Sequence, residues 1–148
     1  MPTDVSAPSR IVYTLGTGRR SEEDFIEILS DYGIEAVIDV RRFPTSKLPH
    51  FSRQNLQPHL QSEGIGYFFL GEDLGGFRKG GYERYASGEE FMKGIDKVED
   101  ILRSACAVII CAERFPWKCH RRWIARELSR RGWHVIHIVD KGKTWEPQ

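Results

Sequence analysis

The sequence has no long apolar run and few cysteines. No stretch approaches the roughly 18 consecutive apolar residues of a membrane-spanning helix, so we expect no membrane partner. Residues 1–10 are polar, contain two prolines and lack the apolar centre of a secretory signal, which predicts a flexible tail. The three cysteines, an odd and low number, indicate a reducing cytoplasm rather than a secreted disulfide framework.

An excess of charge of one sign is also missing. The 148 residues carry a net charge of +1, which by itself indicates neither a nucleic-acid nor a membrane partner. Locally, residues 114–131 hold seven basic residues and one acid. Such a run is equally consistent with a solvated helix face and with a surface that binds anions. Within it, Arg122, Arg126 and Arg130 recur at a spacing of four, and we favour simple solvation for this stripe.

Short β-rich runs alternate with segments of helical periodicity. Strands are predicted at residues 11–15, 36–40, 67–70, 107–111 and 134–139. Helices are predicted over 21–33, from 55 onward, over 87–102 and over 119–131. This alternation predicts a single three-layer α/β domain over residues 11–140, with a mostly parallel sheet of about five strands and helices on both faces. Residues 141–148 are predicted to form a C-terminal tail.

Open parallel sheets bind ligands outside the carboxyl ends of their strands. In this chain those ends fall at residues 16–20, 41–46, 71–76 and 111–121. We therefore expect the working residues to come from these four segments.

The segment from Cys111 to Arg121 carries the strongest signal. Cys111 ends an apolar strand, and Cys119 is predicted in the first turn of the next helix, where free N–H groups and the helix dipole stabilise a thiolate. Lys118 and Arg121 add positive charge, so we expect a lowered pKa for Cys119 and an anion at the same turn. Cys106 is interpreted as a packing residue.

Other residues of this segment leave alternatives open. Glu113 suits a general acid or base, or an ion pair with a neighbouring cation. His120 suits a base, a phosphate donor or a metal ligand, or a simple helix cap. A metal ion at Cys111, Cys119 and His120 is the weaker interpretation, because the gap between the cysteines does not match structural zinc sites. A reversible disulfide between the two cysteines is a comparable alternative, and we expect no cofactor.

A second group of polar residues follows the strand that ends near Asp39. Asp39 and Arg41, with Pro44 and Ser46 in the next loop, suit the orientation of a polar substrate and the bidentate binding of phosphate or carboxylate. Alternatively, Asp39 pairs with Arg41 or with Arg121 as an internal strut. The loop of residues 16–20 is similar to a phosphate-binding turn, but it lacks the complete glycine pattern.

Taken together and in this order, these segments resemble an uncharacterised family, the domain of unknown function 488, from about Val12 to Asp140. The resemblance is carried by Thr14-Leu15-Gly16, Arg20-Ser21, Asp39-Val40-Arg41, Pro44, Ser46, Leu74-Gly75-Gly76, Cys111-Ala112-Glu113, Pro116, Cys119-His120-Arg121 and Ile124-Ala125. Thr17 stands where the family typically has histidine, so a catalytic role for that histidine cannot apply here. Lys47 stands where arginine is usual, which keeps the charge and loses the fork geometry.

The resemblance implies an α/β fold and a polar cleft lined by these motifs, and it brings no established reaction. The predicted catalytic residues are Cys111, Glu113, Cys119, His120 and Arg121. The predicted substrate-binding residues are Arg20, Asp39, Arg41, Pro44, Ser46, Gly75 and Gly76.

We expect an enzyme that acts on a phosphate-bearing substrate, either a nucleotide or a nucleic acid. In this hypothesis Cys119 is the nucleophile or redox thiol, Glu113 carries protons, and Arg41 with Arg121 binds the anion. The alternative is a non-catalytic nucleic-acid or ligand-binding module whose cysteines sense redox state or metal. A purely structural interaction domain is the third hypothesis.

Overall fold

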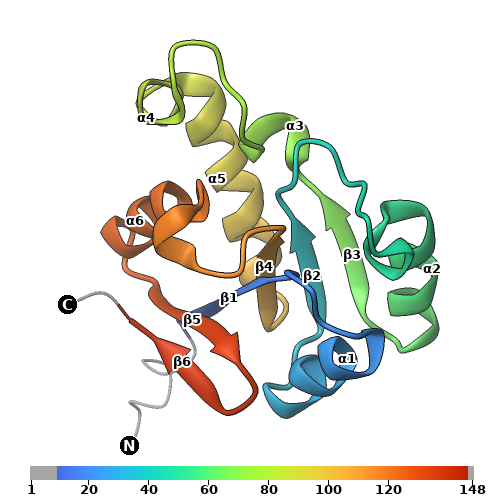
Figure 1. Ribbon diagram of the computed structural model, residues 1–148. Coiled ribbons are helices and arrows are strands. Elements are labelled where there is room, and N and C mark those ends of the chain that lie inside the picture. The colour runs from blue at the N-terminus through green and yellow to red at the C-terminus, as the bar shows by residue number, and fades with distance from the viewer. Residues whose placement is uncertain (1–9, 147–148) are drawn as a thin grey trace, which may run out of the picture.

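A computed structural model describes residues 10–146 of the chain. Six strands form one sheet in the order β3-β2-β4-β1-β5-β6 (Figure 1). They are β1 (Ile11–Gly16), β2 (Ala36–Asp39), β3 (Gly66–Phe69), β4 (Ala107–Cys111), β5 (His134–Asp140) and β6 (Lys143–Trp145). The first five strands pair in parallel and β6 pairs antiparallel with β5, so the predicted mostly parallel sheet is confirmed.

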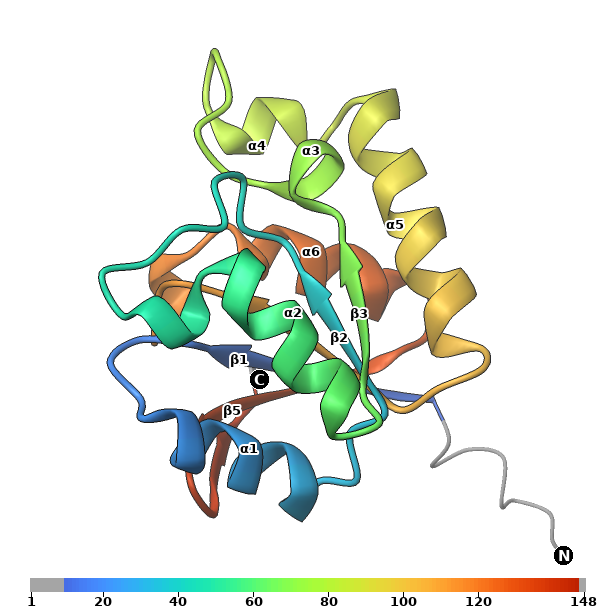
Figure 2. The same cartoon turned by 90° about the vertical axis from the view of Figure 1, so that its right-hand side faces the viewer.

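Helices cover both faces of the sheet, which confirms the three-layer α/β arrangement (Figure 2). One face is covered by α1 (Glu22–Asp31) and α2 (Arg53–Ser62), and the other by α5 (Glu89–Leu102) and α6 (Arg121–Arg130). Two one-turn helices, α3 (Gly71–Leu74) and α4 (Tyr82–Tyr85), lie between β3 and α5. The described residues also form two 3-10 turns, η2 (Pro49–Phe51) and η3 (Pro116–Lys118).

The core has two halves because β4 is buried along its whole length. Ile109 on one side of the strand packs with the cluster that includes α5 and α6. Val108 and Ile110 on the other side pack with α1 and α2. A strand buried on both faces is expected to be continuously apolar, as this one is. The chain therefore reaches the carboxyl end of β4 from a rigid, fully enclosed element.

The local signals for α1 act as expected. Ser21 is the N-cap, and its hydroxyl oxygen accepts a hydrogen bond of 3.0 Å from the backbone N–H of Asp24. Phe25, Ile28 and Leu29 are the buried residues of this helix, at the spacing of one helical face.

Two helix starts differ from the sequence prediction. α2 begins at Arg53, two residues earlier than expected, which places Pro58 inside the helix. The backbone N–H of Arg53 donates to the carbonyl of Pro44, and its guanidinium lies 4.4 Å from the centre of the Phe69 ring. These two contacts hold the earlier start in place. Ser87 does not cap α5; its hydroxyl donates to the carbonyl of Arg84 instead.

Both described ends of the chain are tied to β5. Where the sequence predicts a C-terminal tail, residues 143–145 form β6, and the ring centre of Trp145 lies 5.6 Å from that of His137. At the other end, residues 1–9 of the predicted N-terminal tail lie outside the described residues. The last predicted tail residue, Arg10, accepts at its carbonyl from the backbone N–H of His134 at 2.7 Å, and its guanidinium donates to the carbonyls of Gly132 and Arg131. A membrane-crossing helix, long and apolar enough, is not found among residues 10–146.

Candidate functional site

The carboxyl ends of three neighbouring strands, β2, β4 and β1, meet at one edge of the sheet. The parallel register places Gly16 beside Cys111 and Asp39 beside Ile110. A cleft of about 370 Å³ opens at this edge, a size within the roughly 300–1,000 Å³ range of small-molecule sites. Six of the predicted site residues line it: Arg41, Gly76, Cys111, Glu113, Cys119 and His120.

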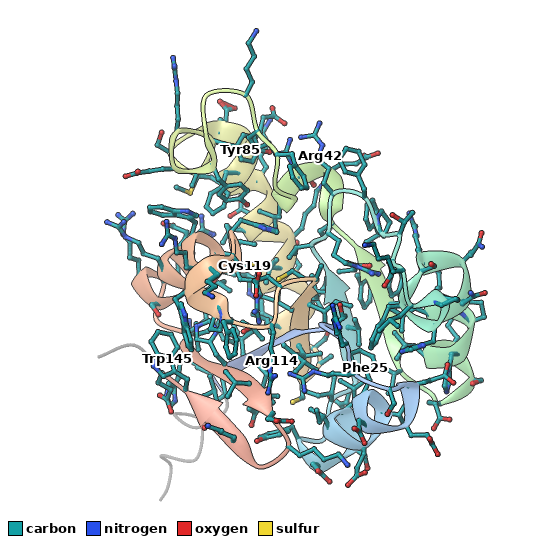
Figure 3. The ribbon with its side chains drawn as sticks, in the orientation of Figure 1. Phe25, Arg42, Tyr85, Arg114, Cys119 and Trp145 are labelled. Atoms are coloured by element: carbon teal, nitrogen blue, oxygen red, sulfur yellow. The ribbon has the colours of Figure 1, made fainter. Side chains whose placement is uncertain are left out.

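The two cysteines of the cleft are in contact. Cys111 lies at the end of β4, and Cys119 lies two residues before α6 rather than within its first turn. The two Sγ atoms are 2.7 Å apart. The sulfur of Cys119 also accepts from the backbone N–H of Arg121, the first residue of α6, at 3.4 Å. The thiol therefore occupies the position at the helix start where the sequence predicts an anion (Figure 3).

Arg121 is a buried cation without a carboxylate partner. Its side chain is completely enclosed and donates to the hydroxyl of Thr14 and to the carbonyls of Glu113 and Arg114, at 3.0, 2.7 and 3.2 Å. Its Nε is buried and has no hydrogen-bond partner among residues 10–146. A buried charge is costly unless an opposite charge accompanies it. The adjacent thiol of Cys119 can supply that negative charge.

The surroundings drive the pKa values of the two thiols apart. The hydrogen bond from Cys111 lowers the pKa of Cys119, and His120 and Arg121 lower it further. Burial raises the pKa of Cys111. These directions favour the thiolate form at Cys119 and the protonated thiol at Cys111.

The orientation of the His120 ring is set by a hydrogen bond from its Nε2. Its Nε2 lies 3.1 Å from the carbonyl oxygen of Val40, which can only accept, so this nitrogen carries a hydrogen. The other nitrogen, Nδ1, faces the sulfur of Cys119 at 3.6 Å. A side chain at Gly76 would come to 3.4 Å from Nδ1, so glycine keeps this side of the ring free. Thiol, imidazole and an orienting carbonyl form the usual arrangement of an activated nucleophile.

Arg41 forms an internal strut with Asp39, which was one of its two predicted roles. Its Nε and Nη2 donate to the carboxylate of Asp39 at 2.9 and 2.7 Å, and its Nη1 donates to the carbonyl of Phe51 at 2.6 Å. The hydroxyl of Tyr67 donates to the same carboxylate at 2.5 Å. Arg41 is 4% exposed, and each nitrogen of its guanidinium already donates to a group of the fold. The guanidinium of Arg121 is held by the fold in the same way, so these contacts favour the strut, and the anion clamp of Arg41 and Arg121 stays a prediction.

The donors of the loop of residues 16–20, which is similar to a phosphate-binding turn, form hydrogen bonds with other parts of the fold. The backbone N–H groups of Thr17 and Gly18 donate to the carbonyls of Cys111 and Ala112 at 2.7 and 3.0 Å. Arg20 donates to the carbonyls of Gly16 and Val139, both at 2.9 Å. This loop connects the ends of β1, β4 and β5, and Arg20 is not among the residues that line the cleft.

Three other predicted binding residues, Pro44, Ser46 and Gly75, are not among the residues that line the cleft. The hydroxyl of Ser46 accepts from the backbone N–H of Leu48, and the carbonyl of Pro44 accepts from Arg53. A side chain at Gly75 would come within 2.6 Å of the Cα of Arg42. Gly75 therefore allows the loops that follow β2 and α3 to pack directly together.

Three aromatic residues of the site were not predicted from the sequence: Phe43, Phe77 and Tyr82 line the cleft. Arg42 and Lys118 also line it, and the sequence indicated them only as positive charges beside the predicted site residues. The sequence signal for the aromatic residues is modest, since they lie next to basic residues in loops that follow predicted strands.

A buried pair beneath the cleft was also missed. The hydroxyl of Thr14 accepts from Arg121 and lies 2.5 Å from Nδ1 of His137. Burial and the charge of Arg121 lower the pKa of His137 to about 4, so this histidine is neutral at neutral pH. The Arg121–Thr14–His137 chain fixes the guanidinium beside Cys119.

The metal interpretation gains no support from the geometry. Within the described part of the chain, no group of three or more histidine, cysteine or acidic side chains is placed to hold a metal ion. The Nε2 of His120 is used by Val40.

A family model described as "Domain of unknown function DUF488" matches residues 21–128, well over half of the chain. The chain belongs to this family. The match to the DUF488 family contains both the Asp39–Arg41 strut and the Cys111–Arg121 segment, whereas Thr14 and His137 lie outside it. The comparisons find no matching curated protein and no matching solved structure.

The Asp39–Arg41 strut generates a stability prediction. Asp39→Ala leaves the buried guanidinium of Arg41 without its counter-charge, and we expect it to lower the free energy of unfolding by roughly 3–5 kcal/mol. The double variant Asp39→Ala, Arg41→Met removes both charges and should recover a large part of this loss. Urea denaturation of the three proteins measures both effects. An unchanged stability of Asp39→Ala would show that the strut is not needed.

The neutral His137 predicts a pH dependence of stability. In the unfolded chain this histidine binds a proton below about pH 6.5, whereas the folded protein resists protonation until about pH 4. The free energy of unfolding should therefore fall as the pH drops from about 7 to 5, by roughly 1–2 kcal/mol from this residue. His137→Gln, which cannot titrate, should show a correspondingly smaller fall in urea denaturation. Equal pH dependence in the two proteins would contradict the prediction.

Proposed function

We propose that this protein is a cysteine-dependent enzyme in which the Cys119 thiolate attacks a phosphate-bearing substrate bound in the cleft. The observation that carries the proposal is the setting of the Cys119 sulfur. It receives the backbone N–H of Arg121, touches the Cys111 thiol and faces Nδ1 of His120, beside a buried guanidinium. These contacts favour a thiolate, the reactive form of cysteine, at neutral pH.

The same contacts suggest the proton path. In the resting ion pair, Nδ1–H of His120 donates to the thiolate. The sulfur electron pair forms a bond to the electrophilic atom of the substrate, and the leaving group departs with its own pair and takes the Nδ1 proton. Water or another nucleophile then attacks the adduct and gives its proton back to Nδ1, and Cys119 leaves as the thiolate. Glu113, exposed in the cleft wall, is the second candidate proton carrier.

Because the guanidinium groups of Arg41 and Arg121 already bind the fold, two other cations are better placed to bind a phosphate. Arg42 and Lys118 both line the cleft, and Lys118 is exposed to solvent. Because these charges are solvated, their attraction for an anion should weaken as salt concentration rises. The limited volume of the cleft favours a small phosphate-bearing molecule over a nucleic-acid duplex.

The contact between Cys111 and Cys119 favours a second candidate function, a redox-sensing module. A peroxide would oxidise the Cys119 thiolate to a sulfenic acid and leave as water or alcohol. The Cys111 thiol would then attack the Cys119 sulfur, form the disulfide and release water. A thiol reductant reverses this reaction, so either function needs a reducing compartment, for which we propose the cytoplasm.

Thiol labelling tests the first function. Cys119 should react with iodoacetamide faster than Cys106 at neutral pH, because burial and Glu35 raise the pKa of Cys106 whereas the pKa of Cys119 is lowered. The labelling rate of Cys119 should also stay high at pH values where ordinary thiols are protonated. Peptide mapping after timed labelling measures each cysteine separately.

A matched pair of variants identifies the cause of this reactivity. Cys111→Ala removes the thiol that contacts Cys119 and should shift its labelling profile to higher pH. Cys106→Ala removes the third cysteine, which lies outside the cleft, and should leave the profile unchanged. If Cys119 labels no faster than Cys106 in the folded protein, the nucleophile proposal fails.

Oxidation tests the second function. A stoichiometric amount of hydrogen peroxide should produce a protein that is two hydrogens lighter and contains a Cys111–Cys119 disulfide. Cys106→Ser should still form it, whereas Cys111→Ser should stop at the sulfenic acid of Cys119. Mass spectrometry of the intact protein and its peptides distinguishes these products. Over-oxidation of Cys119 in the presence of Cys111 would show that the two thiols do not form a functional pair.

A further inference from the structure

Two phenylalanine rings stand in solvent at the mouth of the cleft. Phe43 follows β2 and is 64% exposed, and Phe77 follows α3 and is 85% exposed. Both line the same cleft as Cys119. Leaving such rings in water forgoes the free energy that burial provides, and neighbouring exposed apolar groups at a cleft commonly mark a binding surface.

The spacing of the two rings suits a flat ligand. Their centres are 6.0 Å apart and their planes are tilted by 35°. A planar ring placed between them at van der Waals distance needs a separation of about 7 Å, since each contact takes about 3.5 Å. A small side-chain rotation opens this gap. A bulky aliphatic group would need a much larger movement.

The backbone at Phe77 carries a cost that packing does not explain. Its φ of 59° is the only positive value for a non-glycine residue within residues 10–146. A bulky side chain in this region is an outlier, and such strain is concentrated at ligand-binding and active sites. Arg42 donates to the carbonyl of Phe77 at 3.4 Å, and Arg78 donates to the carbonyl of Gly75 at 2.8 Å. The loop is thus held in a strained conformation that directs an exposed ring to the cleft.

Positive charge lies next to the rings. The guanidinium carbon of Arg42 is 5.8 Å from the centre of the Phe43 ring, and Lys118 lines the same cleft. Aromatic faces beside cationic side chains bind ligands that combine a planar base with a phosphate. A sugar phosphate without a base would use the cations and leave both rings in water.

We infer that the ligand of this cleft is a nucleotide whose base stacks between Phe43 and Phe77 while its phosphate meets Arg42 and Lys118. The inference rests on the proposed function for the phosphate and for the attack by Cys119. It adds the chemical class of the group that the two rings hold.

Direct binding measurements test the inference without relying on the thiol. Isothermal titration calorimetry compares the four ribonucleoside 5′-monophosphates with ribose 5-phosphate. Stacking of a base is worth roughly 1–3 kcal/mol, so at least one nucleotide should bind about ten- to a hundred-fold more tightly than ribose 5-phosphate. Phe43→Leu and Phe77→Gly should remove most of this difference and leave the affinity for ribose 5-phosphate unchanged.

The variants separate binding from folding. Phe77→Gly removes the ring and also the strain of the positive φ, so its melting temperature should be equal to or higher than that of the parent protein. Phe68→Leu is the matched control, because Phe68 is a partly exposed phenylalanine of β3 that does not line the cleft, and nucleotide affinity should not change. A lower melting temperature of Phe77→Gly would indicate a structural role for the ring and overturn its assignment.

The outcomes also separate this inference from the proposed function. Equal binding of nucleotides and ribose 5-phosphate, or no binding of either, overturns the stacking site even if Cys119 labels rapidly. Slow labelling of Cys119 with tight, Phe43-dependent nucleotide binding overturns the nucleophile and leaves the stacking site in place.

Discussion

Arg121 is the largest side chain that the fold encloses completely, and its charge constrains everything around it. Its hydrogen bonds connect the start of α6 to β1 through Thr14 and to the turn after β4 through the carbonyls of Glu113 and Arg114. These bonds hold the three elements that meet at the cleft. They do not supply a negative charge, so the buried cation favours any arrangement that places an anion next to it. The Cys119 sulfur accepts from the backbone N–H of Arg121, and the charge of Arg121 lowers the pKa of Cys119. Arg121 therefore has both a structural and an electrostatic role at the cleft.

The fold contains a second buried arginine, Arg41, whose charge is paired with an opposite charge. Arg41 has a carboxylate partner in Asp39, which satisfies its charge within the strut. Arg121 donates only to neutral oxygens, and among residues 10–146 its Nε has no hydrogen-bond partner. The charge of Arg121 is therefore left to act on its surroundings, and it lowers the pKa of Cys119. This difference favours chemistry at the β4–α6 connection over the end of β2.

The elements with strong periodicity could be predicted from the sequence, whereas for the charged side chains the sequence left the choice between alternative partners open. The apolar run of β4 and the capped α1 required only local patterns. The exposed, three-residue β6 has no apolar pattern and depends on contacts of Trp145 with residues far along the chain. Likewise, the sequence allows Arg41 to be either an anion clamp or an internal strut. The contacts with Phe51 and Tyr67 that favour the strut depend on the fold. Phe43 and Phe77 meet only because Gly75 lets their loops pack.

Locally unfavourable features gather at this one edge of the sheet. The partnerless Nε of Arg121 lies beneath it, the positive φ of Phe77 lies at its rim, and two phenylalanine rings are left in water there. Elsewhere the same fold buries its apolar residues in two well-formed clusters and caps α1 with Ser21. A sequence that violates local rules in one place while obeying them around it is the usual pattern of a functional site. β4 packs on both faces and so holds Cys111 in a fixed position at the cleft. Through the contact of the two sulfurs it also fixes the position of Cys119, so the reactive group keeps its place among these unfavourable features.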